Sequence, residues 1–157
     1  MNRMSKSAFT LLELLVTMAI IAVIAGMLLT ALTKARQSAW RARARDSVYQ
    51  LVVAWKSYLN DYRQFPDIAI TEMNTNAVSI LGTTNTVYND RFLYMEFTKK
   101  EWADGFRDKW DELYQVRLDT DYDGKVTTPH GDVGKSIVVW SKGQDKTDNT
   151  TDDIKSW

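Results

Sequence analysis

The apolar positions of the chain are concentrated in one run near its amino terminus. Residues 9–32 comprise 24 positions, and Glu13 is the single charged residue among them. A helix of this length extends about 36 Å at about 1.5 Å per residue, whereas the hydrocarbon core of a bilayer is about 30 Å thick. The run therefore predicts a helix that spans a membrane.

The same run differs from a cleavable secretory signal. The apolar part of such a signal is about 7–15 residues long and is followed by small residues at the cut. Here the run is longer, and the small pair Ser7-Ala8 precedes it. A membrane anchor is the favoured interpretation, and a cut after Ala31 or Ala35 by ordinary signal peptidase is the alternative.

A regular spacing of apolar residues continues beyond the run. These residues recur at three- and four-residue steps, which is the period of an amphipathic helix. They are Ala44, Val48, Leu51, Val52, Trp55, Tyr58, Leu59 and Tyr62. Pro66 disfavours helix at the preceding residue, so we expect this helix to end within residues 60–64. Because nothing interrupts the pattern, we predict a single helix over residues 9–62.

Two later segments predict β-strands. Residues 112–118 and 136–141 carry the β-branched and aromatic residues that are typical of strands. Two or three antiparallel strands would bury the apolar stripe of the helix. The predicted fold is therefore α+β, a long amino-terminal helix packed by a small antiparallel sheet. Five residues are expected to pack against the stripe: Trp110, Tyr114, Val116, Val138 and Trp140.

The other segments predict shorter elements. Residues 67–90 predict a variable loop with one short helix near 77–81, and residues 91–97 predict a strand or a short helix. Residues 99–102 predict a helical turn, and residues 119–134 predict a turn region.

Composition excludes several classes of function. The 20 basic and 20 acidic residues cancel, so no overall positive field attracts nucleic acid. The absence of cysteine excludes disulfides, thiolate zinc sites and cysteine nucleophiles. His130 is the single histidine, and we interpret it as an ordinary surface or turn residue. The sequence presents no catalytic constellation, and the chain is predicted not to be an enzyme.

Glu13 lies within the apolar run, where an ionised carboxylate costs at least a few kcal/mol. A cut between Ala8 and Phe9 would create an ammonium group at Phe9, four residues before Glu13 on the same helix face. The helix dipole would also favour an anion near this end. Glu13 of one copy could then neutralise the Phe9 ammonium of a neighbouring copy, and this pairing would favour the packing of helices.

The residues around this junction resemble a known processing signal. The signal of type IV pilins and type II secretion pseudopilins is similar to the segment Lys6-Ser7-Ala8 and the residues 9–16 that follow, with the sequence FTLLELLV. The resemblance implies that a prepilin peptidase cuts before Phe9 and N-methylates the new terminus. It also implies that Glu13 is required for assembly. The family usually has glycine before the cut, where this chain has Ala8.

The resemblance implies a structural role in protein secretion. The chain would be a subunit of a type II secretion pseudopilus, a helical filament of further copies and minor pseudopilins built on an assembly platform in the bacterial inner membrane. The implied domains are a leader at 1–8, a transmembrane and filament-core helix at 9–33, an amphipathic helix at 34–64 and a pilin-like head at 65–157. A type IV pilus pilin at the cell surface and a plain membrane-anchored calcium-binding domain are the alternatives.

Charges beside the apolar run favour a different orientation from the one that the resemblance implies. Lysine and arginine near a span tend to stay in the cytoplasm. The leader carries Arg3 and Lys6, and the other side carries Lys34, Arg36, Arg41, Arg43 and Arg45. Charge alone would keep the head in the cytoplasm, whereas the resemblance implies a periplasmic head. The basic residues could instead bind lipid headgroups, face acidic patches of neighbouring copies or form a solvated helix face.

The first of two acidic loops resembles the opening of an EF-hand. Asp119, Asp121 and Asp123 alternate, and Gly124 follows where a sharp turn is needed. His130 then occupies the twelfth position, where a bidentate glutamate belongs. The favoured interpretation is an Asp-Gly hairpin turn, and calcium binding is the alternative.

The second acidic loop follows residue 141. Residues 141–154 are similar to the C-terminal loop of the major type II pseudopilins, in which a Ser-x-Gly-x-Asp turn and a later Asp-Asp-Ile close around calcium. The resemblance implies that Asp145, Asp152 and Asp153 are ligands, and oxygen ligands suit calcium better than zinc. A solvated acidic tail is the alternative.

Overall fold

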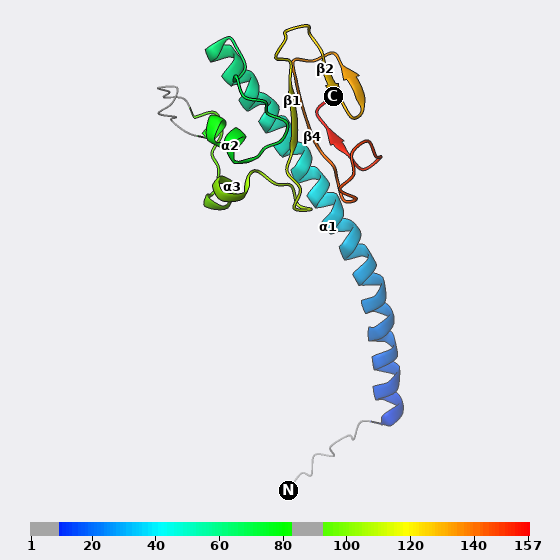
Figure 1. The fold of residues 1–157 in the computed structure, drawn as a ribbon. Coiled ribbons are helices and arrows are strands. Elements are labelled where there is room, and N and C mark those ends of the chain that lie inside the picture. Colours follow the sequence, from blue (N-terminus) through cyan, green and yellow to red (C-terminus); the bar gives the residue numbers. More distant parts are fainter. Residues whose placement is uncertain (1–9, 83–92) are drawn as a thin grey trace. The chain divides into compact units, whose positions relative to one another are not determined.

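One long helix is the main element of the chain. The computed structural model describes residues 10–82 and 93–157. Helix α1, Leu11–Tyr62, confirms the prediction of one uninterrupted helix (Figure 1), although the predicted start at Phe9 lies outside the described residues. The chain divides into two compact units, Met1–Ala39 and Trp40–Trp157. We call the second unit the head.

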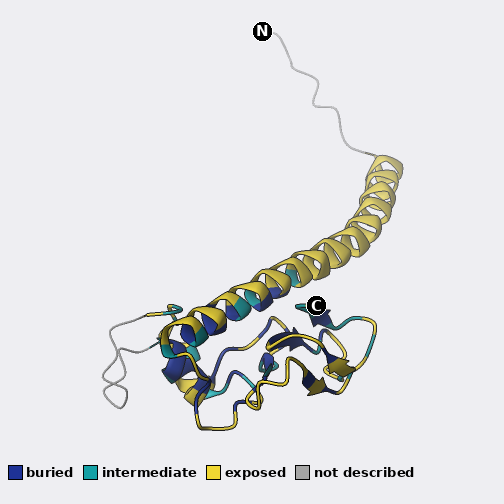
Figure 2. Cartoon of the chain, turned by 90° about the horizontal axis from the view of Figure 1, so that it is seen from above, coloured by how far each residue is buried: buried dark blue, intermediate teal, exposed yellow. Residues whose placement is uncertain are grey.

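In the first unit, α1 is apolar on every side. Between Leu11 and Leu32 the large apolar side chains are 46–90% exposed (Figure 2). The helix is long and apolar enough to cross a membrane. None of the residues in its most apolar 18-residue stretch is buried. A helix that is hydrophobic all round is stable only in apolar surroundings, so this segment requires lipid or other protein around it.

In the head, α1 buries a single stripe. The fully or almost fully buried residues are Ala44, Val48, Leu51, Ala54, Trp55 and Tyr58. Leu59 and Tyr62 pack at the edge of the same core. The helix ends at Tyr62 and the next residue, Arg63, has a φ of 57°. This left-handed residue and the nearby Pro66 stop the helix where the sequence predicted.

Two short helices lie beside this core. Helix α2, Thr75–Gly82, confirms the short helix predicted near 77–81, and α3, Lys99–Asp104, confirms the helical turn predicted at 99–102. Thr98 and Glu101 cap α3 reciprocally. Residues 93–97 form neither a strand nor a helix, so that prediction is wrong for them, and residues 91–92 lie outside the described residues.

A small antiparallel sheet completes the α+β fold. Strands β1, Gln115–Leu118, β4, Ile137–Ser141, and β5, Ile154–Lys155, are ordered β1-β4-β5 (Figure 1). Strand β4 lies in the centre and pairs with both neighbours in antiparallel fashion. The predicted strands and the predicted fold class are confirmed. Strand β5 follows the second acidic loop, where the sequence predicted no strand.

A second, two-stranded sheet was missed by the sequence analysis. Strand β2, Val126–Thr128, pairs with β3, Gly131–Val133, and Thr128 faces Gly131 in the register. The reversal therefore lies at Pro129-His130. The prediction of an Asp-Gly hairpin turn is wrong, because Asp123-Gly124 lie in the connection between β1 and β2.

Strand β4 contributes to two cores. Ile137 and Val139 join the core around the α1 stripe. A second cluster consists of Val126, Val133, Val138 and Trp140. The prediction that Val138 and Trp140 pack against the stripe is therefore wrong, because successive side chains of a strand point to opposite faces. The other three predicted residues do join the helix core: Trp110, Tyr114 and Val116.

Candidate functional site

Glu13 lies in the first turn of α1, where it caps the helix together with Thr10. The Thr10 backbone N–H donates to Glu13 Oε2 over 2.9 Å, and the Thr10 hydroxyl donates to the same oxygen over 2.9 Å. The Glu13 backbone N–H donates in turn to Thr10 Oγ1 over 3.2 Å. These reciprocal bonds satisfy N–H groups that a helix start leaves without partners.

The cap fixes a carboxylate at the start of an apolar surface. Glu13 is the acidic residue of the first turn, and the described residues that follow it are uncharged up to Leu32. The predicted processing residues Ala8 and Phe9 lie outside the described residues. The contribution of Thr10 was missed, although the Thr-x-x-Glu spacing that signals such a cap is present in the sequence.

The first acidic loop gathers its three predicted carboxylates. One oxygen from each of Asp119, Asp121 and Asp123 lies within 4.8 Å of the others. Asp119 is buried, and its carboxylate accepts the backbone N–H groups of Asp123 and Gly124 over 3.1 and 3.0 Å. This carboxylate therefore shapes the connection between β1 and β2. Calcium binding at these residues stays a prediction.

Asp152 organises the start of the C-terminal acidic loop. Its Oδ2 accepts the backbone N–H groups of Gln144 and Asp145 over 2.6 and 3.2 Å, and its Oδ1 accepts the Thr150 hydroxyl over 2.8 Å. Burial acts to raise the pKa of Asp152, but these hydrogen bonds outweigh it and lower the pKa below the ordinary value. The loop therefore favours the ionised carboxylate.

Gly143 allows this close approach. Its φ is +70°, and a Cβ added there would lie 2.5 Å from both the carbonyl and a carboxylate oxygen of Asp152. Its N–H donates to Ser141 Oγ, whose hydroxyl donates to the buried carboxylate of Asp108. Steric crowding by Asp152 therefore explains why a glycine stands at this position of the Ser-x-Gly-x-Asp turn.

Asp153 joins the far side of the loop to the β2–β3 turn. Its Oδ2 contacts His130 Nε2 at 2.5 Å and accepts the backbone N–H groups of Asn149 and Thr150 over 2.8 and 3.1 Å. The two side chains are almost completely buried, 4% exposed for His130 and 0% for Asp153. His130 lies in a turn, as expected, but it is not an ordinary surface residue.

The three predicted ligands of this loop are linked by shared contacts: the Asp152 carboxylate contacts the Asp145 side chain, and the Thr150 hydroxyl lies 2.8 Å from Asp152 Oδ1 and 3.3 Å from Asp153 Oδ1. The Asp145 carboxylate accepts the N–H of Thr147 and belongs to an exposed residue. Asp152 and Asp153 also accept the backbone N–H groups named above. Within the residues that the structure describes, Asp119, Asp121 and Asp123 are the group whose carboxylate oxygens all lie within 4.8 Å of one another. Calcium binding by Asp145, Asp152 and Asp153 stays a prediction.

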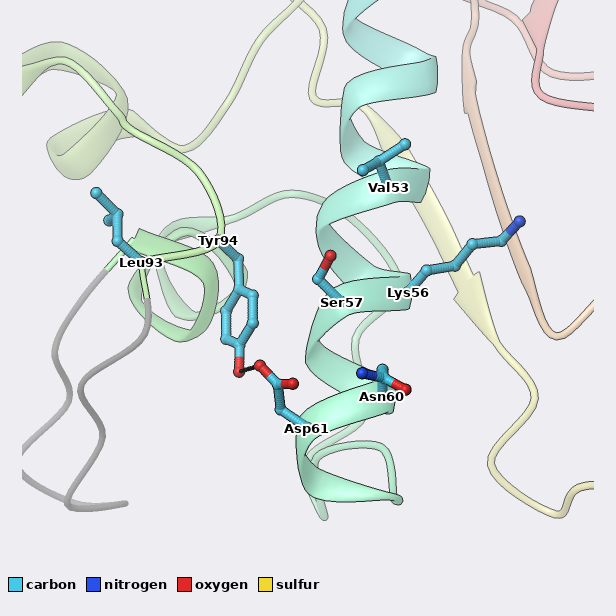
Figure 3. Close-up of a pocket in the computed structure, with 7 residues that line it drawn as sticks. All are labelled: Val53, Lys56, Ser57, Asn60, Asp61, Leu93 and Tyr94. Atoms are coloured by element: carbon cyan, nitrogen blue, oxygen red, sulfur yellow. Dashed lines mark hydrogen bonds between the residues drawn. The ribbon is translucent and has the colours of Figure 1, made fainter.

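An open groove lies beside the solvent face of α1 in the head. It is lined by Val53, Lys56, Ser57, Asn60, Asp61, Leu93 and Tyr94 (Figure 3). The Tyr94 hydroxyl donates to Asp61 Oδ2 over 2.9 Å. The single histidine of the chain lies in the β2–β3 turn and not in this lining. These lining residues therefore form no Ser-His pair that could activate a nucleophile.

Comparison with known proteins identifies the amino-terminal segment. Residues 3–29 match the family model of the prokaryotic N-terminal methylation motif. No curated protein and no solved structure matches the chain. The matched segment contains the predicted cut, Glu13 and most of the exposed apolar helix. Proteins with this motif are structural rather than enzymatic. The chain thus carries the N-terminal methylation motif on an apolar anchoring helix, which supports a type IV pilin-like protein processed by prepilin peptidase.

Proposed function

We propose that the chain is a subunit of a type II secretion pseudopilus that supports protein secretion. The observation that carries the proposal is the methylation motif at residues 3–29, placed on a helix whose apolar side chains are exposed on every side from Leu11 to Leu32. Such a helix can be held by lipid before assembly and by other helices afterwards.

Processing would prepare the helix for assembly. Cleavage between Ala8 and Phe9 leaves an ammonium group one residue before Thr10, whose N–H already contacts Glu13. In a filament, the Glu13 carboxylate of one copy pairs with the Phe9 ammonium of the next. An unpaired charge in apolar surroundings is costly, so the pairing makes the bundled helices more favourable than separate ones and sets their stagger.

The head would lie in the periplasm, with the helix anchored once in the inner membrane. This orientation rests on the methylation motif at residues 3–29, which is a more specific signal than the count of basic residues beside the span. Minor pseudopilins and the assembly platform of the secretion system would be the other partners. The C-terminal loop, with its Ser-x-Gly-x-Asp turn followed by Asp-Asp-Ile over residues 141–154, favours a pseudopilus subunit over the second candidate, a type IV pilus pilin.

Deletion of the gene from its host separates these two candidates. We expect exported proteins to accumulate in the periplasm while surface pili remain, and complementation with the wild-type chain to restore secretion. Loss of surface pili with normal secretion would instead identify a pilus pilin. Secretion and pili that both stay normal would contradict the proposal and favour a plain membrane-anchored domain that binds calcium.

A further inference from the structure

The first turns of α1 in the head carry arginines that have no partner in their own chain. Arg41, Arg43 and Arg45 are exposed, and none of the three forms an ion pair within the residues that the structure describes. Arg41 and Arg45 lie four residues apart on one face of the helix, where like charges repel each other. This pair, which we call the arginine face, is therefore open to an anionic partner from outside the chain.

Lipid headgroups are not well placed to neutralise the whole arginine face. Arg41 and Arg45 follow the last residue of the apolar run, Leu32, by nine and thirteen positions, which corresponds to about 14 and about 20 Å of helix. The headgroup layer on each side of a bilayer is about 5–8 Å thick. Because Arg45 lies beyond this layer, a partner outside the membrane is favoured.

The other end of the head is acidic. Asp121 and Asp123 are exposed in the β1–β2 connection, where an oxygen of each lies within 4.8 Å of the other and of Asp119. Asp67 is exposed in the segment after α1 and lines one open groove together with Tyr122. Neither Asp67 nor Asp121 forms an ion pair within the described part of the chain. We define the acidic tip as the exposed residues of these two segments: Asp67, Ile68, Asp121, Tyr122 and Asp123.

Helix α1 separates the acidic tip from the arginine face. The Phe65 ring stacks on the Tyr122 ring at a centroid distance of 5.9 Å, and the Phe65 N–H donates to the Tyr122 hydroxyl over 2.9 Å. This contact holds the β1–β2 connection beside the end of α1 at Tyr62 (Figure 1). From Arg45 to Tyr62 the helix rises about 26 Å, so the two surfaces of one head cannot contact each other.

The acidic tip also exposes apolar side chains. Tyr122 and Ile68 are 55% and 44% exposed. Exposed tyrosine beside aliphatic and charged side chains is typical of the surfaces at which proteins bind each other. A metal ion would use only the carboxylates, whereas a protein partner would cover the apolar side chains as well.

A second copy of the chain offers the opposite charge to each surface. Residues 34–45 contain five basic residues and no acidic one, whereas residues 46–157 contain 19 acidic and 13 basic residues. A contact between two different surfaces of the same chain is head-to-tail, and it builds an open helical filament where its rotation does not close a ring. We propose that the acidic tip of one copy binds the arginine face of another copy within the filament. This inference rests on the proposed function, since it requires copies that their apolar helices hold together.

Charge reversal in the full chain, followed in host membranes, tests the contact. The chain has no cysteine, so cysteine pairs introduced into the apolar helix give a ladder of linked copies. Arg41→Glu with Arg45→Glu places like charges opposite the acidic tip, and we expect the linked copies to fall by about tenfold or more. Asp67→Arg with Asp121→Arg should have the same effect. A chain with all four substitutions has complementary surfaces of exchanged sign and should recover most of the ladder.

Lys99→Glu with Lys100→Glu is the matched control. These lysines are exposed on α3, so the pair changes the charge by the same amount away from both surfaces and should retain the ladder. The Tm of every variant in detergent should stay within about 3 °C of the wild type, because all the substituted residues are exposed. A smaller ladder then reports on assembly and not on folding.

Two results would overturn the inference. The first is a normal ladder with either pair of reversals. The second is a folded chain with all four substitutions that recovers no ladder, which would favour lipid headgroups as the partner of the arginine face. A wild-type chain that gives no ladder at all would instead contradict the proposed function, so the two failures are distinguishable.

Discussion

Glu13→Val is expected to leave membrane insertion intact and to abolish filament formation. Valine keeps the segment apolar, so the helix still spans the bilayer. The Phe9 ammonium exposed by processing would then lie among apolar helices without a counter-ion, at a cost of a few kcal/mol per subunit. That cost recurs at every subunit, so the polymer and not the monomer is lost.

Crosslinking between copies measures this effect. The chain has no cysteine, so pairs of cysteines introduced into the apolar helix report only on neighbouring subunits. We expect a ladder of linked copies with the wild-type sequence and a monomer band with Glu13→Val. Thr17→Val is the control, since it removes a hydroxyl that bonds within its own helix and should retain the ladder. A normal ladder with Glu13→Val would show that Glu13 does not control assembly.

Trp55→Ala is expected to destabilise the head by about 3–5 kcal/mol. Trp55 is fully buried in the α1 stripe and packs edge-on against Tyr58 with a centroid distance of 5.8 Å. Small domains are stable by only about 5–15 kcal/mol, so the variant is close to unfolding. Chemical denaturation of the full chain in detergent, followed by far-UV circular dichroism, measures the free energy of unfolding.

Val53→Ala is the matched control for that measurement. Val53 lies two residues earlier on the same helix, but its side chain is 63% exposed. Its loss should change the free energy of unfolding by less than about 0.5 kcal/mol. Equal effects of the two substitutions would mean that the stripe of α1 is not the centre of the core.

The helical part of the fold was predictable because its signals are local. The apolar run, the three- and four-residue spacing and Pro66 together determined where α1 lies and where it ends. The three-residue strands β2 and β3 were missed because such short segments carry little periodicity. Their turn at Pro129-His130 lacks the Asn-Gly or Asp-Gly pair that usually indicates a hairpin.

The contacts of the candidate functional residues were predictable only where the two partners are close in sequence. Glu13 stands out as the one charge of an apolar run, and its partner Thr10 is three residues away. The sequence indicates the acidic C-terminal loop, but His130 approaches Asp153 from 23 positions earlier. That contact depends on how the β2–β3 turn packs against Trp140 and Trp157, which no local pattern encodes. The direction of Val138 and Trp140 likewise depended on the register of β4.

The intact mass of the chain purified from its native membrane shows whether prepilin peptidase has processed it. We expect a mass that lacks residues 1–8 and carries one additional methyl group, with the methyl located on the amino-terminal Phe9 by fragmentation. A chain that retains Met1 and carries no methyl group would contradict it, because the helix would then be a plain anchor that no prepilin peptidase had processed.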